Sequence, residues 1–475
     1  MAKKKKTDLL YIMNPNCGWC KKADPVVEEL VKEGHKITTL NITNSEEMAK
    51  ASQIKSKHNL QCGTPLFIDA ESGNSVCGFR PKEQLVNWAK GEKMPEPERK
   101  PTAPPSRPAP KRVKLEYIWL DGGKSRKLRS KVRYEILHLM EPSADNPGAN
   151  MNQQIFEKTP EWSFDGSSTS QATTEDSDLI LKPVKIYPNV MEMTQQNSQM
   201  SMFVFCEVYN TDGTPHESNS RHKLRTYVDT IEKDDVRVSF EQEFVFWNEK
   251  FNVPAGWEGS ETPSNILEPT KEGEYYCGLG GQAGSLRNLV DAHAKMCYQL
   301  GIALTGYNAE VLKSQWEYQT AITNVMKAAD DLWISRFLLY KICESRGLDV
   351  SFDPKPISGD HNGSGCHINF STAKMREEFE TEYIDSMIET LALNHEKAIS
   401  VYGYDNDKRL TGKNETSNID EFTYGKSDRS ASIRIPTTGN YLEDRRPGAN
   451  IDPYEALLNL REVVKSAEES ILTEA

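Results

Sequence analysis

The chain contains no long apolar run and no excess of positive charge. Its hydrophobic stretches are short and interrupted by charged residues, which excludes a transmembrane helix, because such a helix needs about 20 mostly apolar residues in succession. The 475 residues include 58 lysines and arginines against 70 aspartates and glutamates, a net charge of −12. General nucleic-acid binding needs a basic surface. We therefore expect neither a membrane nor a nucleic acid among the partners.

Cysteine is scarce, and the sequence shows no secretory signal. The stretch MAKKKKTDLLYIM starts with basic residues, but its apolar run of about five residues is too short for the core of a signal peptide. The nine cysteines are an odd number, which does not suggest a framework of disulfides. Together these observations predict a cytoplasmic protein with mostly free thiols.

Large apolar side chains are nearly absent between residues 91 and 112, which read GEKMPEPERKPTAPPSRPAPKR. Seven of these residues are proline, and Met94 is the only apolar side chain larger than alanine or proline. Such a segment cannot bury enough apolar surface to offset the entropy lost on ordering, and a proline-rich chain is extended and semi-stiff. We therefore predict a first domain at 1–92 and a linker at 93–112, followed by a second folded part.

The first 92 residues alternate between strand-like and helix-like segments. Short apolar runs at 9–13, 36–42 and 64–69 predict strands, and helical periodicity follows the first two of them. Cys17 and Cys20 form a C-x-x-C motif, CGWC, at the first strand-to-helix turn. The partial positive charge of a helix N-terminus favours a thiolate there. Cys17 is therefore predicted as the attacking thiol and Cys20 as the resolving thiol.

This order of elements, with the CGWC motif, resembles the thioredoxin/glutaredoxin family. Thr64-Pro65 looks like the cis-proline site that lies beside the cysteine pair in that family. The resemblance implies an α/β thioredoxin-like domain with thiol–disulfide redox activity. An alternative is a structural zinc site of four thiolates, completed by Cys62 and Cys77. The second pair is not a tight C-x-x-C, and the strand–helix context favours the redox interpretation.

Beyond the linker, acidic residues fall on the polar faces of predicted strands. In VSFEQEFVF (238–246) the alternation places Glu241 and Glu243 on one face and mainly apolar residues on the other. Adjacent carboxylates repel one another unless a cation or water compensates them. Further candidate ligands occur in separate segments: Glu310 and Glu317 in NAEVLKSQWEYQ, His367 in GCHINFS and Glu443 in YLEDRRP. Oxygen-rich sites with one histidine suit Mg²⁺ or Mn²⁺ better than zinc.

Arginines follow in the same part of the chain. They are Arg409 in RLTGKNET, Arg429 and Arg434 in DRSASIRIP, and Arg445 in YLEDRRP. Several arginines that converge near divalent cations are what phosphoryl transfer requires. Each motif alone is more simply interpreted as a solvated strand face, and only their joint occurrence favours a catalytic site.

The sequence from about Leu115 to Tyr454 resembles the eukaryote-type (type II) glutamine synthetase family. The motifs that carry the resemblance occur in family order: WSFDGSSTSQA, FEQEF, YYCGLGG, NAEV with QWEYQ, FDPKPISGDHNGSGCHINFST, RLTGKNETSN, RSASIRIP and YLEDRRP. The resemblance implies an α+β fold with a β-grasp domain at 113–215 and an antiparallel-sheet catalytic domain at 216–475. It also implies that ATP drives the ligation of ammonia to L-glutamate through γ-glutamyl phosphate. The expected assembly is a homo-oligomer of stacked rings, a decamer, with active sites shared between subunits.

The same resemblance implies a role for each candidate residue. Two metal ions, Mg²⁺ or Mn²⁺, would be held by Glu243, Glu310 and Glu317 and by Glu241, His367 and Glu443. Glutamate would be bound by Asn362, Gly363 and Arg409. The phosphoryl group and ATP would be contacted by Arg429, Arg434 and Arg445, with Ser371 near the nucleotide. Glu415 would be the flap carboxylate that closes the site and takes a proton from ammonium, and Asp165 and Ser168 of a neighbouring subunit would capture ammonium.

The sequence also departs from the family pattern. Asn414 stands where the family usually has His before the flap Glu, and Asp428 where it usually has Asn before Arg429. Residues 143–158 look like an insertion. Two other functions fit the same fold, a related γ-glutamyl-amine ligase and a non-enzymatic scaffold. The Asp165 and Ser168 pair argues against the first, and the retention of every predicted metal ligand argues against the second.

Overall fold

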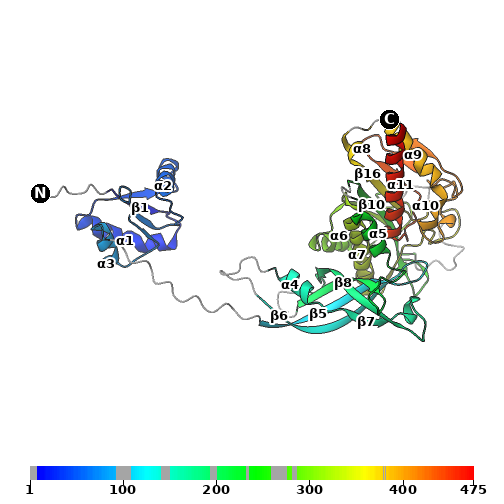
Figure 1. The fold of residues 1–475 in the computed structure, drawn as a ribbon, viewed down its shortest axis with the longest axis horizontal. Helices are drawn as coiled ribbons and strands as arrows, with labels where there is room; N and C mark the ends of the chain where they lie inside the picture. Colours follow the sequence, from blue (N-terminus) through cyan, green and yellow to red (C-terminus); the bar gives the residue numbers. More distant parts are fainter. Residues whose placement is uncertain are drawn as a thin grey trace. The chain divides into compact units, whose positions relative to one another are not determined.

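The structure is a computed structural model that describes residues 8–92, 109–140, 150–192, 200–231, 235–257, 275–280, 286–377, 379 and 381–474. The chain divides into two compact units, Met1–Pro105 and Ser106–Ala475 (Figure 1). No helix among the described residues is long and apolar enough to cross a membrane. Most of the predicted linker lies outside the described residues, but strand β5 (Ala109–Leu120) begins within the range 93–112. The second unit therefore starts before residue 113.

Strands and helices alternate in the first unit as its sequence predicts. The elements are β1 (Leu9–Met13), α1 (Gly18–Lys32), β2 (Ile37–Asn41), α2 (Ser45–Lys57), β3 (Leu66–Asp69), β4 (Ser75–Cys77) and α3 (Lys82–Ala89). The sheet has the order β2-β1-β3-β4, with β1 and β2 parallel and the other pairs antiparallel. Helices α1 and α3 pack on one face through Leu30 and Trp88, and α2 packs on the other through Ala51.

Local signals in the sequence fix the helix ends of this unit. The side-chain oxygen of Asn44 accepts hydrogen bonds from the N–H groups of Glu46 and Glu47 and so caps the N-terminus of α2. Gly34, just after α1, has a φ of 99°, a conformation that glycine adopts without steric cost. The Thr64–Pro65 peptide bond is cis and directly precedes β3.

The second unit begins with a five-stranded mixed sheet. Besides β5 it contains β6 (Leu128–Leu139), β7 (Trp162–Asp165), β8 (Asp178–Pro188) and β9 (Met200–Tyr209), in the order β6-β5-β9-β8-β7. Strands β5 and β9 are parallel, and the other pairs are antiparallel. Helix α4 (Met151–Lys158), which lies in the predicted insertion, packs Ile155 against the core of this sheet.

A ten-stranded sheet forms the centre of the second unit. Its main path is β12-β13-β10-β16-β19-β18-β17, and β11, β14 and β15 pair with β10. The strands are β10 (Arg237–Asn248), β11 (Val253–Pro254), β12 (Leu304–Ala309), β13 (Gln315–Thr320), β14 (Thr323–Asn324), β15 (Asp349–Ser351), β16 (Cys366–Ser371), β17 (Tyr424–Lys426), β18 (Ile433–Ile435) and β19 (Leu442–Asp444). The expectation of a purely antiparallel sheet is wrong at one edge, because β17 and β18 pair in parallel.

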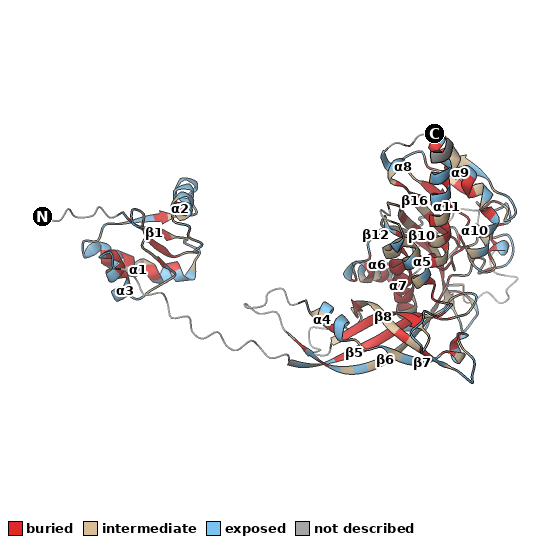
Figure 2. Cartoon of the chain, in the orientation of Figure 1, coloured by how far each residue is buried: buried red, intermediate tan, exposed pale blue. Residues whose placement is uncertain are grey.

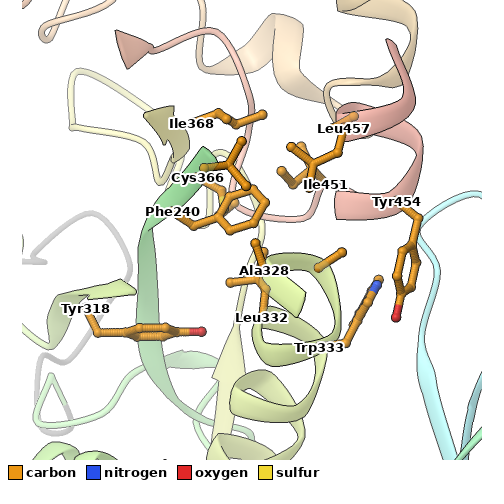
Figure 3. Close-up of a cluster of buried hydrophobic side chains, with 14 of the residues drawn as sticks. Phe240, Tyr318, Ala328, Leu332, Trp333, Cys366, Ile368, Ile451, Tyr454 and Leu457 are labelled. Atoms are coloured by element: carbon orange, nitrogen blue, oxygen red, sulfur yellow. The ribbon is translucent and has the colours of Figure 1, made fainter. Parts of the chain in front are cut away.

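Helices pack against this sheet and against one another. Helices α6 (Arg287–Gln299) and α7 (Val325–Glu344) contact its strands, and α11 (Pro453–Glu474) contacts α7, α5 (Ser220–Asp229), α9 (Thr381–Leu393) and α10 (His395–Val401). Helix α8 (Ala373–Glu377) follows β16 in the chain. Buried side chains follow the sheet strands and the inner sides of these helices (Figure 2). Phe240 of β10 and Ile368 of β16 belong to the same cluster of buried side chains as Ala328 and Leu332 of α7 (Figure 3). The residues that alternate with them therefore point to the opposite face of the sheet.

A polar pair within this core is fully satisfied. Gln242 is completely buried on the apolar face of β10, and its Oε1 accepts a hydrogen bond of 2.8 Å from Nε of Arg336 on α7. Arg336 also donates to the carbonyl oxygens of Ile451 and Ala449. Because buried charges need partners, this network ties β10, α7 and the segment before α11 together.

Candidate active site

Strand pairing brings the predicted metal ligands together on the polar face of the sheet. Glu241 of β10 pairs with His367 of β16, and Glu243 of β10 pairs with Glu317 of β13. Side chains of directly paired residues point to the same face. On the next strands of the sheet, Glu443 of β19 pairs with Asn369 of β16 and with Arg434 of β18, so these side chains point to the same face as well.

A cavity of about 490 Å³ lies over this face. Its walls are formed by Glu241, Glu243, Tyr276, Glu310, Val311, Glu317, Asn362, His367, Asn414, Glu415, Arg429 and Arg445. A small adjoining cavity shares many of these residues and adds Gly363 and Arg409. Five of the six predicted metal ligands therefore line the two cavities, and the sixth, Glu443, does not. The three predicted glutamate contacts, the predicted flap residue Glu415, and Arg429 and Arg445 line them as well.

His367 and two carboxylates form the tightest group in this region. Nδ1 of His367 lies 3.5 Å from Oε2 of Glu241 and 3.6 Å from Oε1 of Glu443. One candidate ligand atom from each residue lies within 4.8 Å of the other two. This ring nitrogen is buried and makes no hydrogen bond with the described residues. Two carboxylates around an unpartnered imidazole nitrogen fit a divalent cation of the Mg²⁺ or Mn²⁺ type.

The charges around this group support the fit. Burial, with a further contribution from Arg445, lowers the pKa of His367 well below its usual range, so the ring is neutral, the form that binds metals. Glu443 is completely buried, and its carboxylate accepts hydrogen bonds from Arg434 and, at 2.6 Å, from Arg445. Two arginine side chains therefore supply the hydrogen-bond partners that a buried carboxyl group needs.

The second predicted ligand set faces the same cavity at wider spacing. Burial, with Glu243 as the next cause, raises the pKa of Glu310 to about 8, and burial with Glu241 and Glu243 raises that of Glu317 to about 9. Such shifts mean that several like charges share a poorly hydrated space. Among the described residues, these three carboxylates do not reach the 4.8 Å spacing of the first set. A bound cation would compensate their repulsion.

Glycines allow a buried arginine to approach His367. Nη2 of Arg409 lies 3.1 Å from Nε2 of His367 and donates to the carbonyl oxygen of Arg445 at 3.1 Å. A Cβ atom on Gly363 would lie 2.7 Å from Cγ of Arg409, and one on Gly365 would lie 2.5 Å from its Nη2. Both positions therefore exclude any larger residue. Burial lowers the pKa of Arg409 to about 10, so it remains a cation at neutral pH.

Sequence reasoning missed two side chains that hold the ligands in place. Asn369 donates a hydrogen bond of 2.8 Å to Oε1 of Glu241, and Gln315 donates to the carbonyl oxygen of Gly363 at 2.9 Å and to Oε2 of Glu243 at 3.3 Å. Asn369 shares a strand face with His367, so alternation was a usable signal for it. Gln315 shares a strand face with Glu317 in the same way, but alternation could not show that its amide would meet the Gly363 carbonyl oxygen.

Several predicted residues do not line the cavity. Arg434 donates a hydrogen bond to Glu443, which does not line the cavity either, and the hydroxyl of Ser371 accepts a hydrogen bond from Arg376 at 3.1 Å. Asp165 is exposed at the end of β7, where Ser168 donates a hydrogen bond of 2.6 Å to its Oδ2. Hydrogen bonds from Ser167 and Ser168 lower the pKa of Asp165, so this exposed carboxylate stays ionised.

The predicted thiol pair lies in the first unit. Cys17 is the N-cap residue of α1, and its Sγ donates to the carbonyl oxygen of Thr64 at 3.4 Å. Hydrogen bonding with Cys20 lowers the pKa of Cys17, whereas burial raises that of Cys20. Cys62 and Cys77 form a disulfide, so they leave no thiolates for the four-thiolate zinc alternative. This disulfide is also an exception to the expectation of mostly free thiols.

Comparisons with known proteins agree on the second unit. The family model "Glutamine synthetase, catalytic domain" matches residues 217–460. The chain is 41% identical over 347 residues to a glutamine synthetase of Yarrowia lipolytica, covering 72% of this chain and 88% of that protein. It is 39% identical over 365 residues to that of Sus scrofa, covering 74% and 91%.

A solved structure shows the same fold. The cryo-EM structure of Plasmodium falciparum glutamine synthetase matches with a TM-score of 0.57 and 18% sequence identity, covering 74% of this chain and 72% of that one. The sequence identities to the two curated relatives, 41% and 39%, extend over 88% and 91% of their lengths. The chain therefore belongs to the glutamine synthetase family and is an enzyme of that family, a glutamate–ammonia ligase.

Proposed function

We propose that the second unit makes glutamine from L-glutamate, ammonia and ATP through γ-glutamyl phosphate, with Mg²⁺ or Mn²⁺ in the cavity. The observation that carries the proposal is the group of Glu241, His367 and Glu443 around an unpartnered, neutral ring nitrogen. A divalent cation bound there would neutralise negative charge on the phosphates of ATP. The wider set of Glu243, Glu310 and Glu317 is proposed to hold a second cation.

The arginines of this chain are proposed to stabilise the transferred phosphoryl group. Arg429 and Arg445 line the cavity, and Arg445 is fixed by its bond to Glu443 and by the donation of its Nε to the carbonyl oxygen of Arg429 at 3.0 Å. Asn362, Gly363 and Arg409 are proposed to bind glutamate, since they lie together at the adjoining cavity. Ser371 and Arg434 are proposed to act near the nucleotide.

Glu415 is proposed as the base that takes a proton from ammonium. It lies on an exposed loop that also lines the cavity, so it can both close the site and accept the proton. Asp165 and Ser168 do not line the cavity of their own chain. They are therefore proposed to serve the site of a neighbouring subunit in a decameric ring, where the ionised Asp165 would attract ammonium.

The first unit is proposed as a thioredoxin-like thiol–disulfide domain. Three features support this: the strand order β2-β1-β3-β4 with helices on both faces, the contact of Cys17 with the residue before cis-Pro65, and the lowered pKa of Cys17 at a helix N-terminus. The domain boundaries that go with this proposal are 1–92 for the thiol domain, 113–215 for a β-grasp domain whose first strand, β5, begins earlier at Ala109, and 216–475 for the catalytic domain.

One experiment separates the proposed reaction from the related amine ligase. The whole chain is assayed for glutamine and for phosphate release with glutamate, ATP and Mg²⁺, and ammonium is replaced in turn by methylamine and by a diamine. We expect product with ammonium at a kcat/KM far above that with either amine. A higher kcat/KM with an amine would assign the chain to the γ-glutamyl-amine ligases. The Cys17→Ser variant in a reduction assay with a small aromatic disulfide tests the first unit.

A further inference from the structure

The loop that carries Glu415 contains a tight turn in which two successive residues have positive φ. The N–H of Thr416 donates to the carbonyl oxygen of Lys413 at 3.2 Å, which closes a four-residue turn around Asn414 and Glu415. Both central residues have positive φ, 52° for Asn414 and 60° for Glu415. Asparagine tolerates this conformation, but glutamate adopts it only at a steric cost. The turn therefore needs support from outside to keep Glu415 in this position.

That support comes from the side chain of Asn414. Its Nδ2 donates to the carbonyl oxygen of His361 at 3.1 Å and to Oδ1 of Asp360 at 3.3 Å. The same carbonyl oxygen of His361 accepts a hydrogen bond from Nζ of Lys355, so the receiving segment is itself held. These bonds join two segments that are more than 50 residues apart in sequence.

The receiving segment continues directly into the glutamate side of the cavity. Asn362, which follows His361, lines the main cavity together with Asn414 and Glu415. Gly363 comes next and packs against Arg409. A contact that holds the turn to His361 therefore connects the position of Glu415 with the segment proposed to bind glutamate.

We propose that Asn414 is a positioning residue that latches the Glu415 turn onto the segment Asp360–Asn362, so that the cavity excludes water while ammonia attacks. The proposal rests on the proposed role of Glu415 as the residue that closes the site. Asn414 acts through Glu415 and touches no reacting atom. Without the latch, water enters and attacks the acyl carbon of γ-glutamyl phosphate, which returns glutamate and releases inorganic phosphate. The consequence is ATP consumption without glutamine.

The test measures phosphate released per glutamine formed, together with kcat and the KM for glutamate. Asn414→Asp keeps the size of the side chain and its tolerance of positive φ, but it removes both donated hydrogen bonds and places a carboxylate beside Asp360. Since each lost hydrogen bond is worth roughly twofold to tenfold in an equilibrium and two bonds are lost, we expect the phosphate-to-glutamine ratio to rise by at least about fourfold. The KM for glutamate should rise as well, because His361 adjoins Asn362.

Two further variants separate the latch from the backbone. Asn414→Gly accepts positive φ even more readily, so any defect it shows comes from the missing side chain; we expect a rise in the ratio of at least about threefold. The double variant Asp360→Asn/Asn414→Asp reverses donor and acceptor between these two side chains but does not restore the donation to the His361 carbonyl oxygen, so it should recover part of the coupling lost in Asn414→Asp. Lys413→Gln, on the exposed neighbour in the same turn, is the matched control and should leave the ratio unchanged.

The outcomes distinguish the latch from the proposal on which it rests. If Asn414→Asp or Asn414→Gly keeps the wild-type ratio and KM, or if the double variant is no better than Asn414→Asp, the latch is overturned. Glu415→Ala is measured in parallel. If Glu415→Ala forms glutamine at the wild-type rate, the closing role of Glu415 fails, and the latch fails with it. If Glu415→Ala is impaired while Asn414→Asp is normal, only the latch fails.

Discussion

The thiol pair of the first unit and the carboxylate site of the second are assembled in opposite ways. Cys17 and Cys20 lie one turn apart at the start of a single helix, and the carbonyl oxygen of Thr64 is the contact from another segment. His367 meets Glu241 and Glu443 only because three strands pair in one register. A site of the first kind depends on one turn, whereas a site of the second kind depends on the whole sheet.

This difference explains why the core matters so much to the carboxylate site. A slip of one residue in the register of β10 would turn Glu241 toward the helices and Phe240 toward the cavity. Phe240, Phe244 and Phe246 are completely buried on the helix side, and their burial opposes such a slip. The alternation that builds the core therefore also places the ligands.

The largest expected effect tests the register directly. Glu243→Ala should reduce glutamine formation by more than about 100-fold. Loss of a residue that only hydrogen-bonds to a metal ligand already costs about 10- to 100-fold, and loss of a ligand itself should cost more. The substitution removes a carboxylate from the cavity face of β10. Activity is measured against Mg²⁺ and Mn²⁺ concentration, and circular dichroism checks the fold.

Glu249→Ala is the matched control for this variant. Glu249 is exposed just beyond the end of β10 at Asn248, away from the cavity that holds Glu243. It should retain activity and the normal dependence on metal concentration. Equal losses in the two variants would contradict the assignment of Glu243 to the metal site.

The second prediction concerns Glu415, which belongs to neither strand nor helix. Glu415→Ala should reduce glutamine formation by about 100-fold, as the loss of a positioned base does. Binding of ATP and glutamate should be nearly unchanged, because the side chain is exposed on the loop over the cavity. Isothermal titration with glutamate and a non-hydrolysable ATP analogue, beside the activity assay, checks both parts. Wild-type turnover in this variant would remove Glu415 from the mechanism.

The comparison of the two sites also shows how far sequence reasoning can reach. The cap at Asn44, the alternation of β10 and the placement of Glu241 beside His367 follow from patterns within one segment or from a shared strand face. The roles of Gln315 and of Gly365 do not, because each depends on which distant segment comes close. The same limit applies to the pairing of Cys62 with Cys77.

The third prediction is the pH dependence of stability in the metal-free protein. Glu310 and Glu317 have folded-state pKa values raised to about 8 and about 9, so the folded protein binds more protons than the unfolded chain between pH 4.5 and 9. Stability must therefore fall as pH rises through this range. With EDTA present, we expect a melting temperature several degrees lower at pH 9 than at pH 6.

Bound metal should cancel most of this pH dependence of stability. A cation compensates the negative charges of Glu310 and Glu317, which protons neutralise in the metal-free protein. The melting temperature with excess Mg²⁺ or Mn²⁺ should therefore change less between pH 6 and pH 9 than with EDTA. The double variant Glu310→Gln/Glu317→Gln should show a flat profile in EDTA as well. A metal-free protein that is more stable at pH 9 than at pH 6 would contradict the packing of these carboxylates in one cavity.

The smallest effect belongs to the local site, where the two cysteines differ only in their places on one helix. Cys17 is partly exposed with a lowered pKa, whereas Cys20 is completely buried with a raised pKa. Since the thiolate is the reactive form, Cys17 should be alkylated at pH 7 at least about tenfold faster than Cys20. Iodoacetamide labelling of the reduced chain, followed by peptide mass spectrometry, measures both rates within one sample.

Because the pKa of Cys17 is lowered, its labelling should persist at pH values where an ordinary thiol no longer reacts. In the Cys17→Ser variant, Cys20 should stay slow, since burial limits it independently of its partner. Similar rates for the two cysteines would mean that the hydrogen bond with Cys20 and the place of Cys17 at the helix N-terminus do not set the chemistry of this pair.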